Sequence, residues 1–273
     1  MGLEGWQAEL SSLKKLHHTN IIRFFGAIYN PSPITYCLVL EYCNGGDLSE
    51  ALVHNTPPNF FTTVASGVAN ALYYLHKLDF LHRDIKPGNV LISGDLSSGS
   101  FVAKLTDFGL AVRVQNTSQN DKNLTAETGT YRYMAPEVIR HEQYDYAADV
   151  FSFAFVMWEI ITREKPFQSK SQIEAAAAVA IEGKRPPFPE TTPTSVKELI
   201  ESCWTEKPSE RMKVEDIINC IDTLTSAAQE WLSDPTGHQV YAKDTVDATP
   251  VNIQLNNKVQ KKKRLSSLFR KKE

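Results

Sequence analysis

The segment 82–89 constrains this chain more than any other feature, because it reads His-Arg-Asp-Ile-Lys-Pro-Gly-Asn and Asp107-Phe108-Gly109 follows eighteen positions after Asn89. The two motifs contribute two carboxylates, Asp84 and Asp107, together with an amide and a lysine. Carboxylate and amide oxygens suit Mg²⁺, and a lysine ammonium suits a phosphate oxygen. The combination predicts a site for phosphoryl transfer, a reaction that needs charge neutralisation and alignment more than covalent help.

Later segments make the pattern specific. Residues 129–137 read Gly-Thr-Tyr-Arg-Tyr-Met-Ala-Pro-Glu, and Arg211 closes a Pro-Ser-Glu-Arg run. In this order the motifs resemble those of eukaryotic protein kinases, of the serine/threonine type and the tyrosine-kinase-like group that includes Raf-like and mixed-lineage kinases. The resemblance extends over residues 4 to about 230. It implies an α+β, bilobal protein-kinase-like fold, ATP and Mg²⁺ as cofactors, protein substrates and an upstream activating kinase.

The resemblance assigns the catalytic set to Asp84, Lys86, Asn89, Asp107 and Thr130. Asp84 would orient the substrate hydroxyl, and Lys86 would face the transferring phosphate. Asn89 and Asp107 would hold magnesium. Thr130 would bridge Asp84 and Lys86.

The resemblance also implies a nucleotide-binding set of Glu9, Leu40, Glu41, Cys43 and Leu91. Glu9 matches the helix glutamate that normally pairs with a lysine, and Leu40 matches the gatekeeper. The backbone of Glu41 and Cys43 would meet adenine, and Leu91 would lie under the ring. For Leu40 a plain role in the strand core is equally compatible.

Other matching residues have structural roles in the family. Glu137 should be buried and paired with Arg211, since a buried carboxylate requires an ionic partner. Asp149 would accept hydrogen bonds from the catalytic-loop backbone, although an ordinary helix cap fits locally as well. His82 is expected to be a scaffold residue. Arg83 suggests control by a phosphate on the activation loop, with unranked acceptors at Thr117, Ser118, Thr125 and Thr128.

Periodicity predicts helices over residues 7–17, 60–78, 148–162, 172–182, 195–202 and 214–227. It predicts strands over 21–28, 35–41, 90–92 and 102–105, with Asp47 capping a helix that starts at Leu48. We therefore expect a partial N-lobe with hinge at 1–43, a mainly helical C-lobe at 44–232 and a disordered polybasic tail at 233–273.

The expected N-lobe is truncated. No Gly-x-Gly-x-x-Gly run occurs, and no lysine precedes Lys14, which lies on the same predicted helix as Glu9. Two strands and one helix would leave a sheet face and an edge uncovered. Three explanations stay open: a fragment or incomplete gene model of an active kinase, which we prefer; a short pseudokinase or regulatory scaffold; or strands supplied by another chain. As written, the chain is expected to bind ATP weakly and to have little activity.

Charge separates the tail from the body. Residues 258–273 contain eight Lys or Arg and one acid, a net charge of +7, which leaves −10 for residues 1–257. The body is therefore not expected to bind nucleic acid, whereas the tail could contact an acidic membrane or a partner. A solvated disordered end is the alternative. The four cysteines form no Cys-x-x-Cys pair, and no long apolar span occurs, so we expect a cytoplasmic protein with reduced thiols, with nuclear entry through the basic tail as an option.

Overall fold

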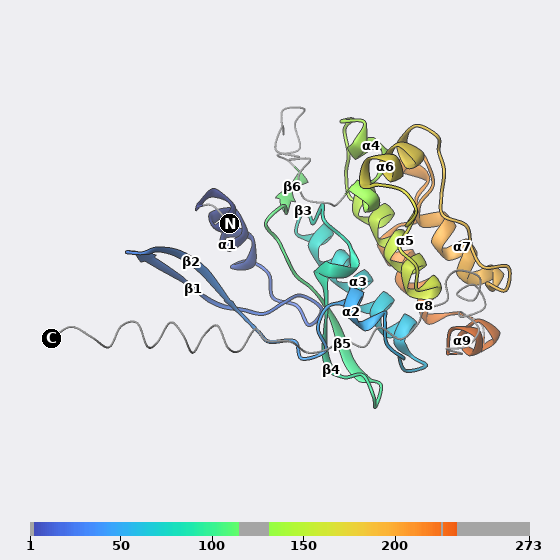
Figure 1. Cartoon of the computed structure of the whole chain (residues 1–273), viewed down its shortest axis with the longest axis horizontal. Helices are drawn as coiled ribbons and strands as arrows, with labels where there is room; N and C mark the ends of the chain where they lie inside the picture. The colour runs from blue at the N-terminus through green and yellow to red at the C-terminus, as the bar shows by residue number, and fades with distance from the viewer. Residues whose placement is uncertain (1–2, 115–130, 225, 234–273) are drawn as a thin grey trace, which may run out of the picture. The chain divides into compact units, whose positions relative to one another are not determined.

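The computed structural model describes residues 3–114, 131–224 and 226–233 (Figure 1). The order of elements is mixed at first and then helical. The helices and strands are α1 (Leu3–Leu13), β1 (Phe24–Pro31), β2 (Ile34–Leu40), α2 (Leu48–Ala51), α3 (Phe60–Lys77), β3 (Phe80–Leu81), β4 (Val90–Asp95), β5 (Ser100–Leu105), β6 (Val112–Arg113), α4 (Pro136–Ile139), α5 (Ala147–Thr162), α6 (Gln172–Ala180), α7 (Thr194–Cys203), α8 (Val214–Asp222) and α9 (Ser226–Ser233). Short 3-10 turns cover Pro87–Asn89, Tyr131–Tyr133 and Pro208–Glu210.

The first elements form a hairpin with one helix beside it. Strands β1 and β2 pair in antiparallel fashion, and α1 lies against β2, where the Trp6 indole donates to the Cys37 carbonyl at 3.2 Å (Figure 1). The hairpin leaves large apolar side chains in solvent, including Phe25, Tyr29 and Ile34, the last of which is 69% exposed. The expectation of an uncovered sheet face is therefore confirmed.

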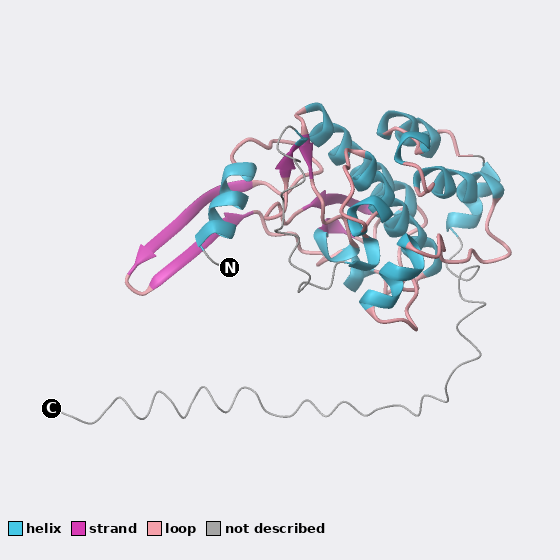
Figure 2. Ribbon diagram, turned by 90° about the horizontal axis from the view of Figure 1, so that it is seen from above, coloured by secondary structure: helices cyan, strands magenta, loops and turns pink. Residues whose placement is uncertain are grey.

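A second hairpin and a long helix carry residues 82–89, the predicted catalytic segment. Helix α3 buries the predicted apolar stripe Phe61, Val64, Val68, Leu72 and Leu75. It packs on β5 and on α8. Figure 2 shows the N-terminal helix beside the two long paired strands. Strands β4 and β5 form an antiparallel hairpin, and the catalytic segment runs from the end of β3 into β4. The hairpin is joined to the N-terminal part by the Ile22 amide, which donates to the Leu105 carbonyl at 2.8 Å.

Helix α5 is the centre of the helical part. Every residue from Ala148 to Thr162 is buried, as the nearly continuous apolar run predicts. Helices α3 and α7 both contact it. Its first turn carries Asp149, which places that carboxylate next to the catalytic segment.

Several predicted boundaries were wrong. The predicted helix over 214–227 is two helices, since α8 ends at Asp222 and α9 begins at Ser226. Strand β1 runs from Phe24 to Pro31 rather than over the predicted 21–28, and Pro31 is tolerated because it pairs only at the hairpin tip. Strand β4 likewise extends to Asp95.

The predicted tail, apart from Ser233, lies outside the described residues. Within residues 3–114, 131–224 and 226–233, none of the helices combines the length and apolar character needed to cross a membrane.

Candidate active site

The catalytic segment draws Asp84, Lys86 and Asn89 into one cluster, in which Asp84 and Asn89 are buried and Lys86 is partly exposed. The Lys86 ammonium lies 2.7 Å from Asp84 Oδ2. The Asn89 amide nitrogen donates to the same oxygen and to the Asp84 carbonyl, both at 2.8 Å. Asp84 is 4% exposed, and its Oδ1 atom has no hydrogen-bond partner among the described residues. The Oδ2 atom of Asp84 is thus held by two side chains, whereas its Oδ1 atom is available to accept a hydrogen bond.

The backbone of this segment is clamped by Asp149. The carboxylate accepts the His82 and Arg83 amides, one on each oxygen and both at 2.9 Å, and it accepts His76 Nε2 at 3.1 Å. Burial alone would raise the pKa of Asp149, but the hydrogen bond and charge of His76 and the amide of His82 keep it below its ordinary value. Asp149 therefore accepts backbone hydrogen bonds from the catalytic loop, as expected, and is more than a local helix cap.

His82 and Arg83 support the loop from inside. The fully buried His82 ring donates through Nε2 to the Thr106 carbonyl at 3.0 Å and packs on Phe108. Arg83 has a left-handed backbone, with φ of +67°, and its guanidinium donates to the Leu110 carbonyl and to the Tyr144 hydroxyl. These contacts fit the scaffold role predicted for His82.

Asp107 and Glu9 are two further carboxylates of the site, close enough for the charge of one to affect the other. The Thr106 amide donates to the Asn89 carbonyl at 3.0 Å, which brings Asp107 next to Asn89. Asp107 is exposed, with a left-handed φ of +62°. Glu9 is 5% exposed, and burial raises its pKa, as does the nearby charge of Asp107, while the Phe108 amide acts in the opposite direction. Its Oε2 atom has no hydrogen-bond partner among the described residues.

The hinge residues join the two hairpins. Leu40 ends β2 and is half-buried, and Cys43 is buried. The Gly45 amide donates to the Ile92 carbonyl at 2.9 Å, which fixes the hinge beside Leu91 on β4. The Oε1 atom of Glu41 accepts the Arg23 amide at 2.7 Å and pairs with Lys104 at 2.9 Å. The Glu41 amide donates to the Arg23 carbonyl at 2.9 Å, so within the backbone of Glu41 it is the carbonyl that is left for a ligand.

A second buried cluster holds the segment that follows the activation loop. Glu137 and Arg211 form a two-pronged ion pair, with N–O distances of 2.6 and 2.8 Å, as predicted. The Tyr133 hydroxyl donates to Glu159 at 2.8 Å, and burial raises the pKa of Glu159 to about 7. The buried Arg132 guanidinium donates to the carbonyls of Pro166, Phe167 and Lys170.

Sequence reasoning missed the roles of Arg132 and Glu159. The available signals were a charged residue inside the Tyr131–Tyr133 turn and an acid, Glu159, within the apolar run that follows Asp149. Thr130 and the acceptor candidates Thr117, Ser118, Thr125 and Thr128 lie outside the described residues, so their roles stay predictions.

The carboxylates, lysine and amide of this site sit in a frame that matches a known family model. The model for the protein kinase domain matches residues 3–220. The chain belongs to the protein kinase family. The predicted family and the α+β fold with few strands and many helices are therefore confirmed.

Curated protein kinases show the same relationship. The chain is 38% identical over 226 residues to serine/threonine-protein kinase STY17 of Arabidopsis thaliana, which covers 81% of this chain and 38% of that protein. It is 37% identical to serine/threonine-protein kinase VIK of the same plant, over 81% of this chain and 51% of that protein. It is 35% identical to human mitogen-activated protein kinase kinase kinase 7, over 79% of this chain and 35% of that protein. The chain thus spans between about a third and a half of the length of these kinases.

Proposed function

We propose that this kinase domain transfers the γ-phosphoryl group of ATP to serine or threonine hydroxyls of protein substrates. The observation that carries the proposal is the Asp84 carboxylate, which has one oxygen fixed by Lys86 and Asn89 and one buried oxygen without a partner. A substrate hydroxyl would satisfy the vacant oxygen. Satisfying a buried acceptor is worth about 1–3 kcal/mol, so the site favours a hydroxyl in line with the transferred group.

Lys86 has a charge role in this proposal. Its ammonium lies beside Asp84 and is partly exposed, so it can meet a phosphate oxygen without leaving the carboxylate. A point charge at that position stabilises negative charge as it moves from the phosphate to the leaving group.

The residues present fit a magnesium-bound nucleotide. The Asn89 amide nitrogen is used by Asp84, which leaves its Oδ1 atom for a cation, and Asp107 offers an exposed carboxylate next to it. Asn89 and Asp107 would hold the ion, which supplies charge neutralisation of the phosphates. The buried Oε2 atom of Glu9 also has no hydrogen-bond partner among the described residues, and a cation beside it would compensate its charge.

The hinge fits the adenine ring. Within the described residues, neither the amide nor the carbonyl of Cys43 enters a backbone hydrogen bond. Leu40 and Leu91 supply half-buried apolar surface near it. A flat base with a donor and an acceptor on one edge matches these groups.

Replacement of Asp84 tests the proposal. In the full-length kinase, Asp84→Asn should lower kcat by about 10²–10⁴-fold, the usual contribution of a positioned proton acceptor, with little change in melting temperature. Asp95→Asn, at an exposed carboxylate near the tip of the β4–β5 hairpin, serves as the matched control and should keep full activity. Transfer to a protein substrate at wild-type rate by Asp84→Asn would refute the assignment.

A second candidate is a regulatory protein that binds partners through its helical part without efficient transfer. The observation in its favour is Glu9, whose carboxylate has no ion-pair partner among the described residues and whose pKa is raised. A calorimetric titration of residues 1–273 with Mg-ATP distinguishes the candidates. Weak binding supports impaired catalysis by this chain, and tight binding contradicts it.

The partners follow from the function. The proposed partners are protein substrates and an upstream kinase that acts on the activation loop, and we propose that the protein is located in the cytoplasm.

Contact of the basic tail with acidic membranes is a separate proposal, supported by its net charge of +7 over residues 258–273. Deletion of these residues should abolish sedimentation with phosphatidylserine vesicles, and unchanged sedimentation would remove the membrane role.

A further inference from the structure

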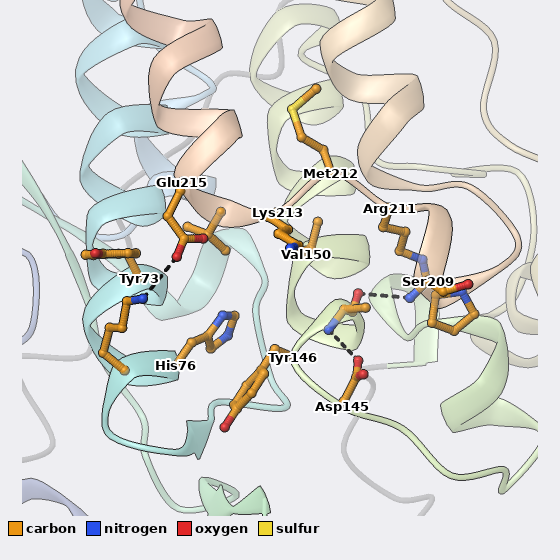
Figure 3. Close-up of a pocket in the computed structure, with 14 residues that line it drawn as sticks. Tyr73, His76, Asp145, Tyr146, Val150, Ser209, Arg211, Met212, Lys213 and Glu215 are labelled. Atoms are coloured by element: carbon orange, nitrogen blue, oxygen red, sulfur yellow. Dashed lines mark hydrogen bonds and ion pairs between the residues drawn. The ribbon is translucent and has the colours of Figure 1, made fainter.

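A cavity of about 360 Å³ lies in the helical part, outside the cluster of catalytic residues. Its walls come from the end of α3, the start of α5 and the stretch from Pro208 to Glu215 (Figure 3). That volume falls within the range of small-molecule sites.

The cavity has aromatic walls. Tyr73, His76 and Tyr146 lie along one side in Figure 3, with Val150 between them and the opposite wall. The His76 and Tyr146 rings pack on each other with centroids 4.7 Å apart. Ring faces of this kind favour a flat aromatic occupant through offset or tilted stacking.

The charges around the cavity cancel. Lys77 pairs with Glu215 at 3.2 Å, and the Asp145 carboxylate accepts the Ala147 amide. Lys213 and Asp145 add one charge of each sign at the rim. The Arg211 guanidinium, which is also part of the lining, is neutralised by Glu137. A neutral occupant avoids the desolvation cost that a charged one would bear here.

The His76 wall is connected to the catalytic segment. His76 Nε2 and the His82 amide bind the same oxygen of Asp149, and the Arg83 amide binds the other. The path from the cavity to the residue before Asp84 thus consists of two hydrogen bonds through one buried carboxylate. An occupant that packs on His76 excludes water from this path and strengthens it.

We propose that this cavity is a binding site for a neutral, flat aromatic small molecule, and that the occupant holds the catalytic backbone in place through His76 and Asp149. The site differs from the proposed nucleotide site, and its occupancy does not depend on phosphoryl transfer. A ligand there stabilises the arrangement in which Asp149 grips both amides.

Indole serves as the probe because it is neutral, flat and small. Binding to the full chain is measured by ligand-observed NMR, and exchange of the His82 and Arg83 amides is measured with and without indole. At an indole concentration of ten times Kd, hydrogen exchange of these amides should slow about 11-fold if it requires release of indole. Amides of α7 (Thr194–Cys203) serve as the internal reference and should change less.

Two variants with a matched control locate the effect. Ser209→Trp places a ring at the mouth of the cavity from an exposed position and should abolish indole binding, whereas Ser98→Trp, at an exposed serine near the β4–β5 tip, should not. His76→Phe keeps a ring in the wall but removes the bond to Asp149, so indole should bind without slowing exchange at His82 and Arg83.

The proposal is overturned if indole shows no saturable binding up to its solubility limit, if it binds Ser209→Trp equally well, or if Mg-ATP displaces it. It is also overturned if indole does not slow exchange of the His82 and Arg83 amides in the wild type, or if it slows that exchange equally in His76→Phe. None of these readouts uses kinase activity, so a failure of the proposed function leaves the result interpretable.

Discussion

Replacing Glu137 with glutamine should strongly destabilise this kinase domain, because it removes one half of a buried ion pair. The Arg211 guanidinium binds both carboxylate oxygens, and the two side chains are 0% and 2% exposed. The glutamine keeps the shape but removes the charge, which leaves a buried guanidinium without its counter-ion. Breaking such a pair costs about 3–5 kcal/mol. The remaining bonds from Arg211 to the carbonyls of Ala147, Thr205 and Glu206 cannot supply the lost charge.

The size of the effect sets the assay. Domains of this kind lose roughly 2–4 °C of melting temperature per kcal/mol, so Glu137→Gln should melt about 6–20 °C lower. Urea unfolding followed by tryptophan fluorescence measures the free energy directly. The matched control is Glu210→Gln, which breaks the exposed pair with Lys207 and should cost less than about 1 kcal/mol.

A double replacement separates the pair from its surroundings. Glu137→Gln combined with Arg211→Met should lose less than the sum of the two single changes, because the second change removes the unpaired charge left by the first. The reasoning is wrong if Glu137→Gln and Glu210→Gln have equal cost, or if the two buried changes are additive.

Three further outcomes follow from the same structure. Arg132→Gln should cost about 2–4 kcal/mol in urea unfolding, because buried carbonyls that now accept from the guanidinium lose their donor; wild-type stability would contradict this. Glu159 should make stability fall as pH rises from about 4.5 to 7, since its pKa is raised to about 7 and the folded state then binds more protons than the unfolded state. Glu159→Gln, which can still accept from Tyr133, should remove that part of the pH dependence, worth about 3 kcal/mol, and an unchanged profile would refute the assignment. Asp47→Ala should cost about 1 kcal/mol through loss of the cap on the Glu50 amide, whereas Asp47→Ser should retain most of it; equal loss in both variants would argue against capping.

The sequence predicted those helices whose apolar pattern agrees with their burial in the fold. Helix α3 has an unbroken apolar stripe, and α5 is apolar on all faces, so burial leaves no competing arrangement. The catalytic cluster was predictable for a different reason. Asp84, Lys86 and Asn89 are close in sequence, so a single tight turn brings them together.

The residues that sequence reasoning missed depend on distant backbone. Arg132 is held by carbonyls 34 to 38 positions further along the chain, which no local pattern encodes. The division between α8 and α9 falls at residues 223–225 and does not interrupt the apolar pattern, so periodicity alone joins the two helices. Glu41 was assigned to the hinge by its backbone, but its bond to Lys104 required the fold of β5.

Hydrogen-bond accounting separates the carboxylates of this site in a way that the motifs alone do not. Asp149 and Glu137 are as buried as Asp84, yet both have all their oxygens occupied by amides or by a guanidinium. Asp84 and Glu9 each retain one buried oxygen without a partner among the described residues. An unsatisfied buried acceptor is costly, and each one in a native structure needs an explanation. The count places Asp149 and Glu137 in the scaffold, whereas for Asp84 and Glu9 we propose a substrate hydroxyl and a cation as the missing partners.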